Sequence, residues 1–173
     1  MKRILVLGGS GFIGRHFCEK AAQLNCRVTV PTRHMVNARS VSPLPWVDVV
    51  EVDIHQEMDL TQLVRGHDAV VNLVAILHGD AEAFDHVHVT LVQKLERACR
   101  GGKVAHLVHI SALGAAADAP SLYQRSKAAG EAVLAASALK STILRPSVVF
   151  GAQDRFLNMF ARMQAIFPVI PLA

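Results

Sequence analysis

A glycine-rich stretch, residues 8–14 (GGSGFIG), follows directly on the apolar run 4–7 and constrains the fold more than any other feature of the chain. An apolar strand must end here, the backbone must turn sharply, and a helix must begin. We expect Gly8 to make the turn, Gly11 to leave room for a phosphate at the helix N-terminus, and Gly14 to let the helix pack close to the strand. The alternative is an ordinary glycine turn between any strand and any helix.

The rest of the chain alternates short apolar runs with helical patterns, which is typical of a parallel sheet covered by helices. The expected strands span residues 3–7, 27–31, 47–52, 69–73, 104–110 and 142–144. The expected helices run through residues 13–24, 60–64, 84–99, 121–137 and 155–167. Right-handed crossovers then predict an α/β fold in one domain over residues 1–173, a Rossmann doubly wound parallel sheet with strand order 3-2-1-4-5-6 and helices on both faces.

Composition excludes several classes of protein. The net charge of +4 is scattered, with no run of Lys or Arg, so nucleic acid is not an expected partner. The three cysteines lie in no metal-like spacing, and His86 and His88 point to different faces of an expected helix, so no metal site is expected. No apolar stretch approaches the roughly 18 residues that span a membrane. We expect a cytoplasmic protein, with a peripheral position at the inner face of a bacterial membrane left open.

The residues after the second expected strand bear on the choice of dinucleotide. NAD-binding Rossmann proteins usually place Asp or Glu there to hold the ribose 2′-OH, whereas this chain has Thr32, Arg33 and His34. The Arg33 guanidinium is suited to pair with a 2′-phosphate through charge-assisted hydrogen bonds. We therefore expect NADP(H) in preference to NAD(H); the alternative is a surface arginine in a loop.

Ser111, Tyr123 and Lys127 are the candidate catalytic residues. Tyr123 and Lys127 are four apart on an expected helix and share a face, so the ammonium is expected to favour the phenolate. Lys127 is also expected to hold the nicotinamide ribose, and Ser111, at the end of the fifth strand, to hydrogen-bond the substrate oxygen. Hydride transfer would then be paired with proton transfer through Tyr123. The alternative for Lys127 is an ion pair with Glu131, one helical turn on.

Together these motifs resemble the extended and atypical short-chain dehydrogenase/reductase family, which contains the NAD-dependent epimerases and dehydratases. The motifs that carry the resemblance are Gly8-x-x-Gly11-x-x-Gly14, Asp53, Ser111, Tyr123-x-x-x-Lys127 and Leu144-Arg145-Pro146. The resemblance implies that Asp53 binds the adenine amino group and that Ile54 lines the ring; the alternative for Asp53 is an acidic residue in a polar loop. It also implies that Phe12, Ile13 and Pro146 belong to the cofactor site.

Residues 150–158 (FGAQDRFLN) are similar to the branch of this family that contains the nucleotide-binding accessory subunit of respiratory complex I and its bacterial relatives. Resemblance to the complex I subunit implies a tightly held NADPH with a structural role. Most other relatives in the family are epimerases, dehydratases or reductases. We therefore expect an NAD(P)(H)-binding oxidoreductase or epimerase-like enzyme with Tyr123 as acid and base. The alternative is a non-catalytic NADPH-holding subunit or assembly protein.

Extended members of the family continue into a small C-terminal substrate domain, and we expect most of the substrate pocket to be missing from these 173 residues. We expect either the N-terminal part of a longer protein or a binding module that a partner completes. The last expected helix carries an apolar stripe, which is either core or a contact for a missing domain, a subunit or a lipid-like substrate. Its members are Phe156, Phe160, Met163 and Phe167. The small-molecule substrate stays unknown, and a homodimer or a larger complex is left open.

Overall fold

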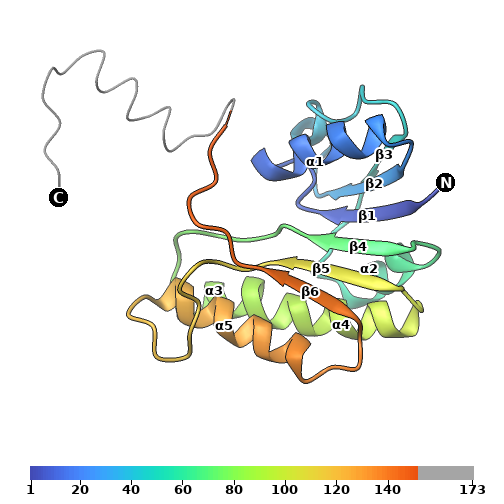
Figure 1. Cartoon of the computed structure of the whole chain (residues 1–173). Coiled ribbons are helices and arrows are strands. Elements are labelled where there is room, and N and C mark those ends of the chain that lie inside the picture. The colour runs from blue at the N-terminus through green and yellow to red at the C-terminus, as the bar shows by residue number, and fades with distance from the viewer. Residues whose placement is uncertain (152–173) are drawn as a thin grey trace, which may run out of the picture.

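Six parallel strands form one sheet in the order β3-β2-β1-β4-β5-β6, which confirms the expected Rossmann topology (Figure 1). The computed structural model describes residues 1–151, so the expected helix 155–167 and its apolar stripe lie outside the described residues. The strands are β1 (Arg3–Leu7), β2 (Arg27–Thr32), β3 (Val47–Glu51), β4 (Ala69–Asn72), β5 (His106–Ile110) and β6 (Ser141–Leu144). Because all of them are parallel, their carboxyl ends meet at one edge of the sheet.

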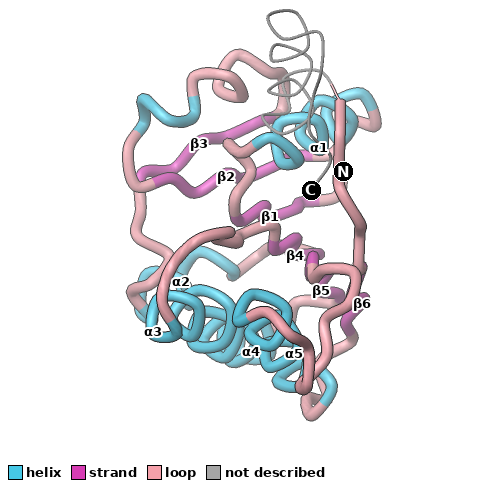
Figure 2. The backbone as a smooth tube through the Cα atoms, turned by 90° about the vertical axis from the view of Figure 1, so that its left-hand side faces the viewer, coloured by secondary structure: helices cyan, strands magenta, loops and turns pink. Residues whose placement is uncertain are grey.

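Helices cover both faces of the sheet (Figure 2). One face carries α1 (Phe12–Gln23) and the short 3₁₀ helix η1 (Met35–Ala38). The other face carries α2 (Glu57–Val64), α3 (Ala81–Asp85), the π-helical turn η2 (His86–Thr90), α4 (Leu91–Gly101) and α5 (Leu122–Ala135). None of the helices described within residues 1–151 is long and apolar enough to cross a membrane.

The alternation of side chains along β1 divides the core into two parts. Leu5 and Leu7 belong to the cluster that α2, α4 and α5 cover, whereas Val6 belongs to the cluster that α1 covers. This division follows from the period of two residues that a strand imposes on its side chains. A central strand with helices on both faces therefore reads as an unbroken apolar run, as residues 4–7 do.

The helical run 81–101 differs most from its expected form. We expected one regular helix over residues 84–99, and the structure has a π-helical turn, η2, between α3 and α4. The run begins three residues early because Asp80 caps α3, accepting a hydrogen bond from Ala83 N at 2.8 Å. The two histidines of η2 do point to different faces, since His86 is exposed and His88 is buried.

Candidate functional site

The glycine turn after β1 has the conformation that its sequence predicts. Gly8 has a φ of +76°, in the left-handed region that favours glycine. A Cβ at Gly14 would lie 2.3 Å from Gly8 O, so α1 packs directly against the turn. Gly11 is the N-cap of α1, and no side chain caps this end of the helix. Uncapped N–H groups at a helix N-terminus form a favourable position for an anion such as phosphate.

A hollow of about 190 Å³ opens beside this turn. It brings together Gly8, Arg33 and Ile54, which come from the ends of three different strands. The other lining residues are Ser10, Pro31, Thr32, Asn37, Val52, His55 and Val74. Within residues 1–151, the charged side chain of fixed sign that lines the hollow is that of Arg33, and no carboxylate lines it. The electrostatic character of the hollow is therefore suited to an anionic ligand.

Asp53 and the start of α1 lie next to these lining residues rather than among them. Asp53 Oδ1 accepts a hydrogen bond from His55 N at 3.0 Å, which fixes the turn after β3. Ile13 is exposed in the first turn of α1, and the Phe12 ring lies close to Gly151, where an added Cβ would meet it at 3.6 Å. Asp53, Phe12 and Ile13 are thus close in sequence to residues that line the hollow, but none of the three lines it.

Sequence reasoning missed His55. Its ring stacks on that of His86 with centroids 4.5 Å apart, and its Nδ1 is buried with no hydrogen-bond partner among the described residues. Burial, and next the charge of His86, lower the pKa of His55. Its position directly after Asp53 and Ile54 was the available signal, because residues just beyond a parallel strand face the ligand edge.

Ser111, Tyr123 and Lys127 follow β5 at the same edge of the sheet, but none of them lines the 190 Å³ hollow. Ser111 N donates to Leu144 O at 2.7 Å, and Leu113 N donates to Pro146 O at 2.9 Å. These bonds join the loop after β5 to the corner after β6. Pro146 therefore lies beside the Ser111 loop.

Tyr123 and Lys127 do share one side of α5. Lys127 is 1% exposed, and its Nζ donates to Ile110 O at 2.7 Å. Burial lowers the pKa of Lys127 to about 8, although the charge of Glu131 raises it. Burial also raises the pKa of Tyr123. This differs from our expectation that Lys127 lowers the pKa of Tyr123, because the ammonium is directed to the end of β5 while the phenol is itself half-buried.

The Tyr123 ring is held by two aromatic neighbours on the helical run 81–101. The ring centroid lies 5.6 Å from that of His88 and 6.1 Å from that of Phe84, both in edge-on arrangements. His88 Nε2 accepts from Ile76 N at 3.1 Å, so the ring proton is on Nδ1 and donates to Ser126 Oγ at 2.8 Å. Burial, and next the charge of Lys127, lower the pKa of His88 to about 4.

A second buried histidine, His109, lies on β5 two residues before Ser111. Asn72 Oδ1 accepts from Val74 N at 3.1 Å, so the Asn72 amide nitrogen donates to His109 Nδ1, also at 3.1 Å. The His109 proton is then on Nε2, which is buried and has no partner within residues 1–151. Burial, and next Lys127, lower the pKa of His109 to about 3. Both histidines are therefore neutral at physiological pH.

Glu131 completes this buried group of polar side chains. Burial by itself raises the pKa of Glu131, but hydrogen bonds and charge from Arg145 lower it overall. Arg145 Nε donates to Glu131 Oε1 at 2.9 Å. Ser111 Oγ lies near this carboxylate but outside the geometry of a regular hydrogen bond, so it is buried without a partner in the described part of the chain. Hence Glu131 pairs with Arg145, and the expected alternative partner, Lys127, bonds to the backbone instead.

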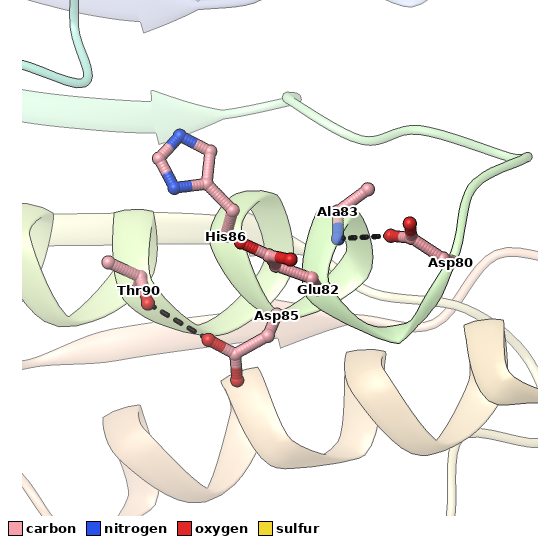
Figure 3. Close-up of a pocket in the computed structure, with 6 residues that line it drawn as sticks. All are labelled: Asp80, Glu82, Ala83, Asp85, His86 and Thr90. Carbon is pink, nitrogen blue, oxygen red and sulfur yellow. Dashed lines mark hydrogen bonds between the residues drawn. The ribbon is translucent and has the colours of Figure 1, made fainter.

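A separate hollow of about 460 Å³ lies over α3 and η2 (Figure 3). Its lining includes three carboxylates, Asp80, Glu82 and Asp85. Asp80 caps Ala83, and Thr90 Oγ1 donates to Asp85 at 3.1 Å. Residues 1–151 contain no group of His, Cys, Asp and Glu arranged to hold a metal ion. The negative charge of this hollow does not suit an anionic dinucleotide, so the glycine turn stays the better candidate.

Comparison with known proteins places the chain among nucleotide-binding folds. A family model described as NAD(P)H-binding matches residues 8–154. The 40 kDa subunit of NADH-ubiquinone oxidoreductase from Neurospora crassa mitochondria is 28% identical over 165 residues, covering 93% of this chain and 44% of that protein. Ceramide reductase from Caulobacter vibrioides is 27% identical over 174 residues, covering 98% of this chain and 53% of that protein. The chain thus spans about half the length of these relatives.

The same likeness is present among solved structures. UDP-glucuronic acid 4-epimerase from Bacillus cereus, in complex with NAD, superimposes with a TM-score of 0.81 at 23% identity. The superposition covers 95% of this chain and 63% of the epimerase. These matches confirm the resemblance to the epimerase/dehydratase fold and to the complex I subunit branch.

Proposed function

The chain belongs to the NAD(P)H-binding family, and we propose that it binds NADP(H) in preference to NAD(H) and uses Tyr123 for proton transfer in a reductase or epimerase-like reaction. The observation that carries this proposal is the glycine turn, which packs against Gly14 and opens into a hollow lined by Arg33 and, among the described residues, by no carboxylate. In this proposal the pyrophosphate binds at the N-terminus of α1, where Gly11, Phe12 and Ile13 begin the helix.

The adenosine end of the dinucleotide would occupy the 190 Å³ hollow. Ile54 offers an apolar surface to the adenine ring, and Asp53 keeps one carboxylate oxygen for the adenine amino group beyond the oxygen that binds His55 N. Arg33 is exposed, so its guanidinium is available to a ribose 2′-phosphate. The 2′-OH of NAD(H) carries no charge to pair with that guanidinium, whereas the 2′-phosphate of NADP(H) does. This is the physical reason for the preference for NADP(H).

Bound nicotinamide supplies the hydride in this chemistry, and the residues of the chain move the proton. Reduction of a carbonyl requires one hydride at carbon and one proton at oxygen, and the Tyr123 hydroxyl donates that proton. The raised pKa of Tyr123 keeps the phenol protonated and ready to donate. Ser111 Oγ, which is buried without a partner among residues 1–151, would hydrogen-bond the substrate oxygen, and Lys127 would position the ribose. Pro146 supports the Ser111 loop through its bond with Leu113.

The test of dinucleotide preference compares Arg33→Ala with Arg39→Ala, an exposed arginine that lies outside the hollow. Dissociation constants for NADPH and NADH are measured by fluorescence titration of the whole chain. Arg33→Ala should weaken NADPH by about 30-fold, the value of a charge-assisted pair, and leave NADH nearly unchanged. Arg39→Ala should change neither. Equal losses for both dinucleotides in Arg33→Ala would refute recognition of the 2′-phosphate.

The test of catalysis uses Tyr123→Phe, which removes one hydroxyl and keeps the ring against His88 and Phe84. Oxidation of NADPH is followed with a panel of ketones, aldehydes and short-chain quinones. The variant should lose turnover while its affinity for NADPH stays within about twofold of that of the wild type. An unchanged rate in the variant would remove Tyr123 from the mechanism.

A second function is a subunit that holds NADPH without turning it over. It is favoured by the similarity to the 40 kDa subunit of the fungal NADH-ubiquinone oxidoreductase. It is also favoured by Lys127, which bonds to Ile110 O instead of lowering the pKa of the phenol. This function predicts NADPH that stays bound through purification and exchanges slowly. Rapid oxidation of bound NADPH by any of the panel substrates would exclude it.

A further inference from the structure

The edge of the sheet opposite the glycine turn is lined with cations. Because the six strands are parallel, all of them begin at this edge, where the chain itself also begins (Figure 1). Exposed lysines and arginines stand at or close to the start of five of the strands. They are Lys2, Arg3, Arg27, Arg65, Lys103 and Lys140. We call this set, with the apolar residues described below, the amino-edge surface.

Few carboxylates balance these charges. Arg27 pairs with Asp48 at 2.6 Å, and Lys2 lies 3.9 Å from Asp68. Within residues 1–151, the cations that follow α2, α4 and α5 have no carboxylate at ion-pair distance. The hollow over α3 and η2 has the opposite character, because three carboxylates line it (Figure 3). The charge of the described chain is thus distributed unevenly, although its net value is small.

Exposed apolar side chains lie among the cations. Leu24, before β2, is 75% exposed, and Trp46, before β3, is 54% exposed. Trp46 has a φ of +63°, and its carbonyl accepts a hydrogen bond from Val28 N at 2.8 Å. A left-handed conformation is unfavourable for a bulky side chain, yet here it leaves the indole in contact with water. Trp46 lines a hollow of about 400 Å³ together with Met1, Arg3, Arg27 and Asp48.

A simpler account of the cations is that they stabilise helix C-termini, whose partial charge is negative. This account fits Arg65 and Lys103, which follow α2 and α4. It does not apply to Lys2, Arg3 and Arg27, which precede or begin strands. It also gives no reason for an exposed leucine and an exposed indole on the same edge.

We propose that the amino-edge surface docks on an anionic lipid bilayer. Lysine and arginine side chains at such a surface are attracted to lipid phosphates, and tryptophan prefers the depth of the headgroups, where its ring is buried and its N–H stays hydrated. An edge that combines exposed cations at five strand starts with two exposed apolar residues fits this surface. Docking in this way leaves the glycine turn and Tyr123, at the opposite edge, open to dinucleotide and substrate. The proposal does not depend on the dinucleotide preference or on catalysis.

The first experiment uses Trp46 as its own reporter, because it is the single tryptophan of the 173-residue chain. The chain is mixed with vesicles of phosphatidylcholine alone or of phosphatidylcholine with phosphatidylglycerol. Trp46 emission should shift to the blue only with phosphatidylglycerol, and added salt should reverse the shift. Brominated lipids should quench it. Failure of the chain to bind phosphatidylglycerol vesicles at low salt overturns the proposal. That result is expected if this edge binds an acidic protein instead.

The second experiment locates the contact. Lys103→Gln with Lys140→Gln should weaken partition by about fivefold for each charge, so about 25-fold together. Arg33→Gln removes one exposed charge at the opposite edge and should leave partition nearly unchanged. Leu24→Gln, at a side chain that is 75% exposed, should reduce the quenching by brominated lipid without unfolding the chain. An equal loss of partition in Arg33→Gln would place the contact elsewhere and overturn the proposal. Binding to vesicles without a change in Trp46 emission would do the same.

Discussion

In the half of the sheet formed by β1, β2 and β3, the core under α1 is built from valines, alanines and one cysteine, and the ion pairs lie at the surface. In the half formed by β4 and β5 with α5, several polar side chains are buried together. They are Asn72, His88, His109, Ser111, Lys127 and Glu131. The first half buries fewer polar groups, Thr32 of β2 among them, whereas the second half gathers its buried polar groups in one place.

In the proposed function this difference would correspond to two kinds of task. A dinucleotide brings its own charges, so the half that would hold its phosphates needs only accessible N–H groups and an exposed arginine. Proton transfer needs groups whose protonation states differ from those in water, and burial is what shifts them. The histidines at 88 and 109 and the ammonium of Lys127 all have lowered pKa values for this reason. Such burial costs stability, which makes the second half more sensitive to pH.

Lowering the pH should produce the largest change in the free energy of unfolding. His88 and His109 have folded pKa values of about 4 and about 3, below their unfolded value of 6.5. Below pH 6.5 the unfolded chain therefore binds more protons than the folded chain. The free energy of unfolding then decreases as the pH falls, until the folded pKa values are reached. From the sizes of these shifts we expect His88 to contribute about 3 kcal/mol and His109 about 5 kcal/mol to this loss. Urea midpoints measured across this window would show it.

A matched pair of variants assigns that loss to the buried half. His88→Asn removes one titrating group and should flatten the dependence of stability on pH, whatever its effect on stability at neutral pH. His78→Asn, at an exposed position, should leave the slope unchanged. Equal slopes in the wild type and both variants would show that His88 takes no part in the acid response.

Gly14→Ala should disrupt the glycine turn in the half of the sheet formed by β1, β2 and β3. Its Cβ would meet Gly8 O at 2.3 Å and Gly9 Cα at 2.5 Å, and backbone atoms cannot move aside cheaply. We expect a loss of about 3 kcal/mol in the free energy of unfolding and NADPH binding weakened by about 100-fold. Gly101→Ala, where a Cβ meets nothing within 4 Å, is the control and should be neutral or slightly stabilising. Normal NADPH binding by Gly14→Ala would contradict the proposed phosphate site.

Arg145→Gln tests a carboxylate of the buried half. Glu131, whose side chain is 10% exposed, would lose its ion pair. We expect a cost of about 2 kcal/mol at neutral pH, below the value for a fully buried pair because Arg145 is half exposed. The pair lowers the folded pKa of Glu131, so its contribution is present at neutral pH and is lost as the pH falls through that pKa. The difference between variant and wild type should therefore shrink in acid, and a constant difference would point to lost packing instead.

Arg27→Gln should give the smallest effect. The Arg27 and Asp48 side chains are 54% and 47% exposed, so solvent screens their attraction. We expect the urea midpoint of unfolding to stay nearly unchanged. A cost equal to that of Arg145→Gln would erase the distinction between the two halves.

The sequence predicted the sheet almost completely, since strands covered on both faces read as apolar runs and the parallel order follows from the alternation with helices. It also located the start of α5, because Ser121 caps the helix by accepting from Gln124 N. These features depend on residues close together in the chain. Local patterns determine them, so an unaided sequence is sufficient.

The buried polar group escaped prediction for the opposite reason. Asn72 meets His109 only because β4 and β5 pair in a register that places these residues side by side. The π-helical turn η2 likewise brings His88 against Tyr123, and a regular period of 3.6 residues gives no sign of it. The sequence placed Lys127 on the face of Tyr123, but Ile110 O, which binds its ammonium, belongs to another element.

The central position of β1 has a consequence for how the chain folds. Its neighbour β2 follows after one helix, but its other neighbour is β4, and Arg3 N reaches Asp68 across 65 positions of sequence. Closing so long a loop costs conformational entropy before any contact compensates for it. The ladder between β1 and β4 should thus form late in folding, joining two partly ordered segments, and its amides should gain protection from hydrogen exchange after those between β1 and β2.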